Sequence, residues 1–173
     1  KTLAGNRCDL LTITNNNKGN KELKKAVVIS ARVHPGESVS SWIMEGVLDF
    51  LLSNTPSAYV LREHFVFKIV PMLNPDGVIN GNYRCSLAGV DLNRQWHHPM
   101  EEVHPTIYSL KRMLTKLHSR VGVSVYLDLH GHSRKKGAFI YGCLPSELIA
   151  ALEASEAEEE TEEEEGDGSS EEN

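Results

Sequence analysis

The chain has 173 residues, a usual length for one domain and long enough to bury a hydrophobic core. Its net charge of −6 is unevenly distributed, because residues 153–173 hold 12 of the 24 acidic residues and none of the 18 Lys and Arg. Residues 1–152 therefore carry +6 and the tail carries −12. A run of Glu repels itself and buries little apolar surface, so we predict a folded domain over 1–152 and a disordered acidic tail over 153–173.

Three kinds of protein are disfavoured. The basic residues are scattered and are not interleaved with aromatic residues, which argues against a nucleic-acid partner. No stretch approaches the roughly 18 consecutive apolar residues of a membrane-spanning helix. The three cysteines are far apart and form no C-x-x-C pair, which favours a reducing compartment over a disulfide framework. The chain opens with neither Met nor a signal peptide, so we expect it to be a piece of a longer protein.

The first predicted elements are a strand and a helix. Residues 26–33 form a short apolar run rich in β-branched side chains, which predicts a buried strand. A turn is expected at 34–36, and residues 40–53 then repeat apolar side chains at helical spacing. We expect the core-facing stripe of this helix to consist of Trp42, Ile43, Val47, Leu48, Leu51 and Leu52.

A second buried strand is predicted over 65–73, stopped by a turn with the sequence Asn-Pro-Asp-Gly. A polar loop follows from 78 to about 104, and Pro105 then opens a helix whose apolar residues recur every three or four positions as far as Val121. Two further strands are predicted at 124–130 and 138–142. Strands separated by helices indicate an α/β fold with a largely parallel sheet.

Ligands of such sheets usually bind beyond the carboxyl ends of the strands, where His34, Asn74 and His130 fall. In His34-Pro35-Gly36-Glu37 a His and a carboxylate three residues apart at a turn can reach one cation, and zinc binds both ligand types. His98 and Glu101 repeat this spacing, but no predicted strand precedes them. We therefore predict that they are solvated loop residues.

A third ligand is expected at the end of the strand over 124–130. A catalytic zinc ion takes three protein ligands and keeps one position open for water. The sequence there is Asp128-Leu129-His130-Gly131-His132, and alternate residues of a strand share one face. The pattern alone leaves both His130 and His132 open as the ligand.

Two arginines, Arg84 and Arg94, lie in the polar loop, the second beside Asn93. A guanidinium group binds a carboxylate through two parallel hydrogen bonds, and an Asn adds a donor. An enzyme that acts at a protein C-terminus needs such a grip on the terminal carboxylate. The alternative is that these arginines are surface residues paired with Asp76 or Asp91.

Six short segments, in this order and spacing, resemble the zinc carboxypeptidases, and specifically their cytosolic carboxypeptidase branch. They are HPGE (34–37), NPDGV (74–78), NYRCSLAGVDLNR (82–94), HPTIYSLK (104–111), DLHGHS (128–133) and AFIYGC (138–143). The resemblance extends over about residues 3–145. It implies a three-layer α/β/α sandwich with a mixed central sheet, of which this chain holds an incomplete part.

The resemblance also implies a metal site with one zinc ion. Its ligands would be His34, Glu37 and His130, which resolves the choice between the two histidines. Asp91 resembles the carboxylate that orients the first His ligand and raises its basicity.

The same resemblance assigns the loop residues to the substrate. Arg84 resembles the arginine that polarises the scissile carbonyl group and stabilises its oxyanion, and Asn93 and Arg94 resemble the pair that anchors the terminal carboxylate. The implied activity is hydrolysis by a metal-activated water of C-terminal residues, glutamates above all, from acidic protein tails such as those of tubulin. The implied location is the cytosol, with association to microtubules, and the +6 charge of residues 1–152 is compatible with an acidic partner.

One part of the family pattern is missing. The family uses a glutamate as general base, in a strand well downstream of the third ligand. After His130 the only carboxylates are Glu147, 17 residues on in a Pro-Ser-Glu turn, and those of the acidic tail. We do not assign Glu147, and we expect the chain alone to hydrolyse slowly or not at all. Two alternatives remain: an inactive protein that binds zinc and acidic tails, and a zinc amidohydrolase of N-acyl amino acids.

Overall fold

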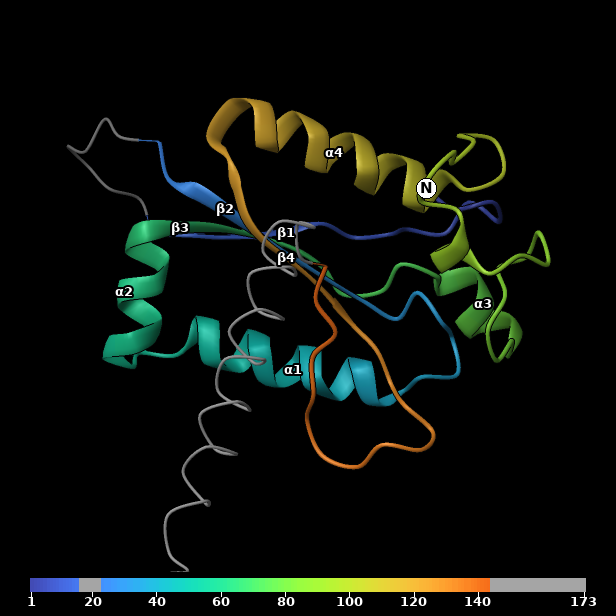
Figure 1. Ribbon diagram of the computed structural model, residues 1–173, viewed down its shortest axis with the longest axis horizontal. Helices are drawn as coiled ribbons and strands as arrows, with labels where there is room; N and C mark the ends of the chain where they lie inside the picture. The colour runs from blue at the N-terminus through green and yellow to red at the C-terminus, as the bar shows by residue number, and fades with distance from the viewer. Residues whose placement is uncertain (16–22, 144–173) are drawn as a thin grey trace, which may run out of the picture. The chain divides into compact units, whose positions relative to one another are not determined.

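The computed structural model describes residues 1–15 and 23–143 (Figure 1). Lys1–Arg134 form one compact unit, and the described residues of a second unit are 135–143. The predicted boundary at residue 152, Glu147 and the acidic tail lie outside the described residues.

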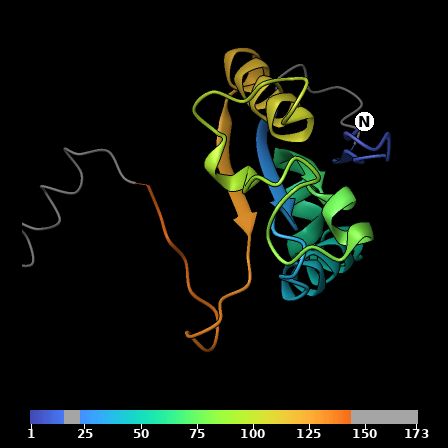
Figure 2. The same cartoon turned by 90° about the vertical axis from the view of Figure 1, so that its right-hand side faces the viewer.

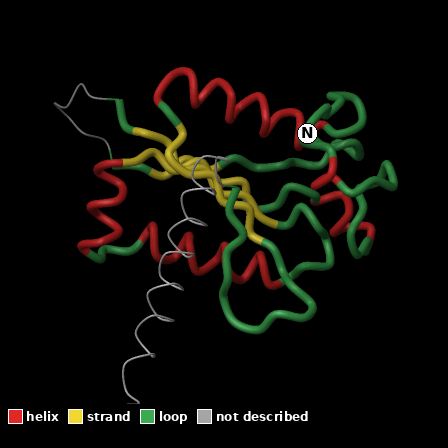
Figure 3. The backbone as a smooth tube through the Cα atoms, viewed as in Figure 1, coloured by secondary structure: helices red, strands yellow, loops and turns green. Residues whose placement is uncertain are grey.

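A mixed sheet of four strands in the order β1-β3-β2-β4 forms the centre of the first unit (Figure 3). Strand β2 (Lys25–Ala31) runs parallel to β3 (Phe65–Val70) and to β4 (Val123–Leu129), whereas β1 (Leu11–Ile13) is antiparallel to β3. The pattern of the sequence predicted a largely parallel sheet, and two of the three strand pairings are parallel; only the pairing of β1 with β3 is antiparallel. The mixed sheet implied by the family resemblance is confirmed.

Helices cover both faces of the sheet. Helix α4 (Pro105–Val121) lies on one side, and α1 (Val39–Leu52) and α2 (Pro56–His64) lie on the other (Figures 1 and 2). Successive residues of a strand point to opposite faces, so β2 contributes to both layers. Val28 packs in the cluster that contains Ile107 of α4, and its neighbour Ile29 packs in the cluster that contains Met44 of α1. The unit therefore has the three-layer α/β/α arrangement.

The core-facing stripe of α1 differs from the predicted one. Met44 and Leu51 are buried, but Trp42 is 70% exposed, and Ile43 and Leu52 are also exposed. Apolar side chains occur on every side of this helix, so their spacing alone does not determine which side faces the sheet. The prediction was correct for Val47, Leu48 and Leu51, which pack on the sheet, and wrong for the other three positions.

Two other predictions are corrected. The sequence Asn-Pro-Asp-Gly begins helix α3 (Pro75–Asn80) rather than a simple turn, because the Asn74 side chain accepts a hydrogen bond from the Gly77 amide at 3.0 Å and caps the helix. Residues 138–142 form no strand, and within the described ranges no other strand pairs with them. An apolar run becomes a strand only where a neighbouring strand takes its backbone hydrogen bonds.

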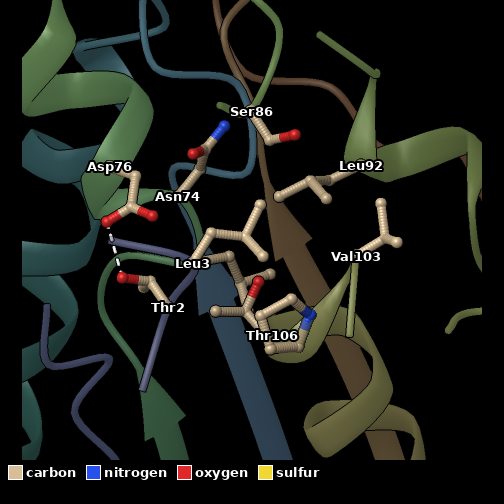
Figure 4. A pocket seen from close by; sticks show the side chains of 10 residues that line it. Thr2, Leu3, Asn74, Asp76, Ser86, Leu92, Val103 and Thr106 are labelled. Carbon is tan, nitrogen blue, oxygen red and sulfur yellow. Dashed lines mark hydrogen bonds between the residues drawn. The ribbon is translucent and has the colours of Figure 1, made fainter. Parts of the chain in front are cut away.

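Asp76, at the start of α3, fastens the amino-terminal segment to the domain. Its carboxylate accepts hydrogen bonds from the Thr2 hydroxyl at 2.5 Å, the Ala4 amide at 2.9 Å and the Asn6 side chain at 2.8 Å. Figure 4 shows Asp76 and Thr2 beside a small pocket that Leu3, Asn74, Leu92 and Thr106 also line. Burial acts to raise the pKa of Asp76, but the three hydrogen bonds outweigh it and hold the pKa below its usual value.

Candidate metal centre

A tight turn after β2 carries the first predicted ligands. Strand β2 ends where Arg32 adopts a left-handed conformation with φ of 58°, which is uncommon for a residue with a side chain. The Arg32 guanidinium group then holds the turn, since Nε donates to the Pro35 carbonyl at 2.7 Å and Nη1 donates to the Ser41 hydroxyl at 2.7 Å. His34 and Glu37 are thereby presented at the carboxyl end of the parallel strands.

His34, Glu37 and His130 converge although 93 residues separate the last two. Nδ1 of His34 lies 2.9 Å from one Glu37 oxygen, and Nδ1 of His130 lies 3.0 Å from the other. Among residues 1–15 and 23–143 these are the one group of three or more His, Cys, Asp or Glu side chains that could hold a metal ion, with one ligand atom of each lying within 4.8 Å of the others. Ligand atoms on one tetrahedral zinc ion lie about 3.4 Å apart, so this donor set and spacing fit zinc.

His132 does not join this group. Its Nδ1 accepts a hydrogen bond from the Arg134 amide at 3.1 Å. Of the two histidines that the strand pattern left open, His130 is therefore the one that belongs to this candidate ligand group. The similarly spaced His98 and Glu101 are both exposed, which confirms the prediction of solvated loop residues.

Each ligand histidine has a second carboxylate on its far nitrogen. Nε2 of His34 lies 3.0 Å from Asp91, the residue predicted for this position, and Nε2 of His130 lies 2.8 Å from Asp128. The hydrogen bond with Asp128 raises the pKa of His130, burial opposes it, and Glu37 adds to the rise. Asp128 was not predicted, although its place two residues before His130 on one strand face was a usable signal.

Two glycines, Gly36 and Gly131, lie where segments of the candidate centre pack closely against one another. The Gly131 amide donates to Glu37 at 2.8 Å, and a Cβ on Gly131 would lie 2.9 Å from the Val39 side chain. The Gly36 amide donates to the Tyr83 carbonyl at 2.7 Å, and a Cβ on Gly36 would overlap the Tyr83 ring at 2.4 Å. Only residues without side chains allow these backbones to approach so closely.

Asp91 also links the centre to the arginine loop. One of its oxygens accepts the Nε–H of Arg84 at 2.8 Å, and the other accepts the Asn93 amide at 2.9 Å, which caps the 3-10 turn Leu92–Arg94. Burial acts to raise the pKa of Asp91, but its hydrogen bonds with His34, Asn93 and Arg84 outweigh it and the pKa lies below its usual value. The alternative pairing of Arg84 with Asp91 is therefore present, and Asp91 joins Arg84 to the candidate ligand His34.

The two residues predicted to anchor a carboxylate lie in this turn. The Asn93 side-chain oxygen accepts a hydrogen bond from the Trp96 indole at 2.9 Å, and Arg94 is exposed at the end of the turn. The small pocket of Figure 4 contains none of the three metal-ligand candidates. No helix in the described ranges is both long and apolar enough to cross a membrane.

Residues 1–142 match the model of the zinc carboxypeptidase family, and the chain belongs to this family. It is 59% identical over 145 residues to cytosolic carboxypeptidase 2 of Mus musculus, covering 83% of this chain and 17% of that protein. It is 53% identical over 157 residues to cytosolic carboxypeptidase 1 of Homo sapiens, covering 86% of this chain and 13% of that protein.

The fold agrees with the family. The crystal structure of a putative carboxypeptidase A from Shewanella denitrificans is 35% identical in sequence and superposes with a TM-score of 0.67, covering 76% of this chain and 33% of that one. The chain thus spans less than a fifth of the length of both curated relatives and a third of this structure.

Proposed function

We propose that this chain provides the zinc ligands and the carboxylate-binding residues of a metallocarboxypeptidase, which hydrolyses the C-terminal peptide bond of a protein. The observation that carries the proposal is the convergence of His34, Glu37 and His130 in a member of the zinc carboxypeptidase family. A zinc ion bound there supplies a Lewis acid and an activated water.

The surrounding residues have distinct parts in this proposal. Asp91 holds the His34 ring with Nδ1 turned toward Glu37, and it takes the Nε–H of Arg84. The terminal amino groups of Arg84 are then the donors for the scissile carbonyl oxygen as it gains negative charge. Arg94 and Asn93 would bind the terminal carboxylate, Arg94 through its planar fork of donors.

We further propose that the substrates are acidic protein tails that end in glutamates, such as those of tubulin, and that the protein works in the cytosol and in association with microtubules. The relatives carry the name cytosolic carboxypeptidase, which supports the location. The charge of +6 over residues 1–152 supports an acidic partner, because a basic surface raises the local concentration of an anionic chain.

The general base is a separate question. From Gly131 to Ser146 the sequence contains no Asp or Glu, so the residues that directly follow His130 supply no carboxylate for this role. We therefore expect the 173-residue chain to bind a C-terminal carboxylate more readily than it hydrolyses one.

Peptide binding to the zinc-loaded chain tests the proposal. A peptide that ends in free glutamates should bind at least about tenfold more tightly than the same peptide with a C-terminal amide, because charge-assisted hydrogen bonds to the carboxylate are lost in the amide. Arg94→Ala should remove this difference, and Arg7→Ala, an exposed arginine paired with Asp9, should keep it. Equal binding of acid and amide by the wild-type chain would contradict the proposal.

Hydrolysis distinguishes the alternatives. The acidic peptide and acetyl-aspartate are incubated with the zinc-loaded chain, and the products are followed by mass spectrometry. Release of acetate would favour an amidohydrolase. Selective binding of the acidic peptide without cleavage, also by a protein extended to the length of the curated relatives, would favour the inactive binding protein.

A further inference from the structure

A chain of hydrogen bonds crosses from β2 to β4 directly behind His130. Ser30 and Asp128 are neighbours in the parallel register of the two strands. The Ser30 hydroxyl donates to Asp128 Oδ1 at 2.6 Å and lies 2.8 Å from the Tyr126 hydroxyl. The other oxygen of Asp128, Oδ2, lies 2.8 Å from Nε2 of His130. Ser30 is completely buried, so the hydrogen bonds between the two strands are shielded from solvent at this residue.

The chemistry of the groups fixes the direction of each hydrogen bond. An ionised carboxylate only accepts, so the single proton of the Ser30 hydroxyl goes to Asp128. The Ser30 oxygen must then accept the proton of the Tyr126 hydroxyl. Burial, with the nearby charge of Asp128, raises the pKa of Tyr126, so the tyrosine keeps its proton and stays a donor.

The same logic continues to the imidazole. Because both oxygens of Asp128 accept, the bond at Oδ2 requires a proton on Nε2 of His130. When His130 is neutral, its Nδ1 then carries the lone pair, and this nitrogen faces Glu37 at 3.0 Å. That nitrogen is the one grouped with the other two candidate ligands.

We propose that Tyr126, Ser30 and Asp128 form a positioning chain that selects the Nε2-protonated tautomer of His130 and aims its Nδ1 lone pair at the metal. The inference rests on the proposed metal centre and deepens it. Asp91, the corresponding carboxylate at His34, is held by the Asn93 amide and the Arg84 side chain. Asp128 is held instead from inside the sheet, through a serine on the neighbouring strand.

Zinc affinity and the tautomer of His130 are the two measurements. Competition with a chromogenic chelator gives the affinity of the full chain, and two-bond proton–nitrogen NMR correlations of the zinc-loaded chain show which His130 nitrogen binds the metal. Asp128→Ala should weaken zinc binding about 10- to 100-fold, the usual effect of removing a carboxylate behind a ligand histidine, and should leave a mixture of coordinating nitrogens.

Two variants that remove fewer interactions serve as a check in case Asp128→Ala does not fold. Asp128→Asn retains an acceptor for Nε2–H and should keep Nδ1 coordination with a smaller loss of affinity than Asp128→Ala. Ser30→Ala should weaken zinc binding about fivefold, as expected for one hydrogen bond. Ser124→Ala, at an exposed position of β4, the strand that carries Asp128, should leave both measurements unchanged.

The outcomes separate this inference from the proposed function. Wild-type zinc binding through Nδ1 of His130, with Asp128→Ala and Ser30→Ala indistinguishable from wild type, would overturn the positioning chain and leave the metal centre intact. A wild-type chain that binds no zinc would overturn both.

Discussion

At the scale of single residues, some members of the candidate metal centre could be predicted from the sequence and others could not. His34 and Glu37 could be predicted because a buried strand precedes them and their spacing suits a turn, and the family resemblance selected His130. The role of Asp128 was not predicted, because a carboxylate can orient a ligand histidine only if it contacts the ring nitrogen that does not face the metal. Which nitrogen that is depends on the tertiary contact with Glu37, 93 residues away from His130.

Zinc should stabilise the folded chain through this centre. At a free zinc concentration 100 times the dissociation constant, binding adds about 2.7 kcal/mol to the free energy of unfolding, and a chelator should remove it. His34→Ala should abolish the zinc-dependent rise in melting temperature. His98→Ala is the matched control, because His98 has the same sequence spacing to a glutamate but is exposed. An equal loss of the zinc response in both variants would contradict the assignment of the ligands.

The contact between Gly36 and Tyr83 makes a second prediction at this scale. Gly36→Ala places a methyl group inside the van der Waals radius of the Tyr83 ring and should lower the free energy of unfolding by about 1–3 kcal/mol. Gly46→Ala, within α1 and with no atom near the new Cβ, should instead raise it by about 0.5–1 kcal/mol. Urea denaturation of the two variants measures both signs, and destabilisation by Gly46→Ala would show that α1 is packed differently.

At the scale of elements, the sequence predicted the long strands and helices well and the short ones poorly. Helix α4 begins at Pro105 and ends at Val121 as predicted. Strand β1 has three residues, too few to show any alternation, and α2 is only nine residues long, with apolar and polar residues in similar number. The rotation of α1 was wrong at three positions because the contact with the sheet, and not the pattern along the helix, selects the buried side.

The observed rotation of α1 can be tested with two substitutions. Met44→Ala should lower the free energy of unfolding by about 2–5 kcal/mol, because Met44 is buried against the sheet. Trp42→Ala removes a larger side chain but should change it by less than about 0.5 kcal/mol, since Trp42 is mostly exposed. The reverse order in thermal or urea denaturation would favour the stripe predicted from the sequence.

At the scale of the whole molecule, the fold class and the position of the site followed from the order of strands and helices, whereas the long-range fastenings did not. The positions of Thr2, Asn6 and Asp76 in the sequence do not predict that their side chains form hydrogen bonds, because such contacts depend on the path of the complete chain. The sequence likewise has no Asp or Glu between Gly131 and Ser146, so the residues that directly follow His130 supply no general base for the proposed activity.

The fastening at Asp76 should make stability depend on acid pH. Its folded-state pKa is below the usual value, so the ionised carboxylate contributes stability that is present above the usual pKa of about 3.9 and is lost as the pH falls through the lowered value. Asp76→Asn should therefore lower the free energy of unfolding at neutral pH and narrow its difference between neutral and acid pH. Asp9→Asn, at an exposed carboxylate, is the control and should leave this difference almost unchanged.

The carboxylate of Asp91 has a thermodynamic consequence. It contacts His34, the proposed metal ligand, with one oxygen and Arg84, the arginine proposed to bind the substrate carbonyl, with the other. A change in the charge or position of one partner alters the strength of the hydrogen bond between Asp91 and the other partner. Binding of the metal and binding of the substrate would therefore be linked through Asp91. Such linkage is reciprocal: the factor by which zinc changes the affinity for a substrate equals the factor by which that substrate changes the affinity for zinc. If bound zinc raises the affinity for a substrate, the protein therefore holds its metal most tightly while a substrate is bound.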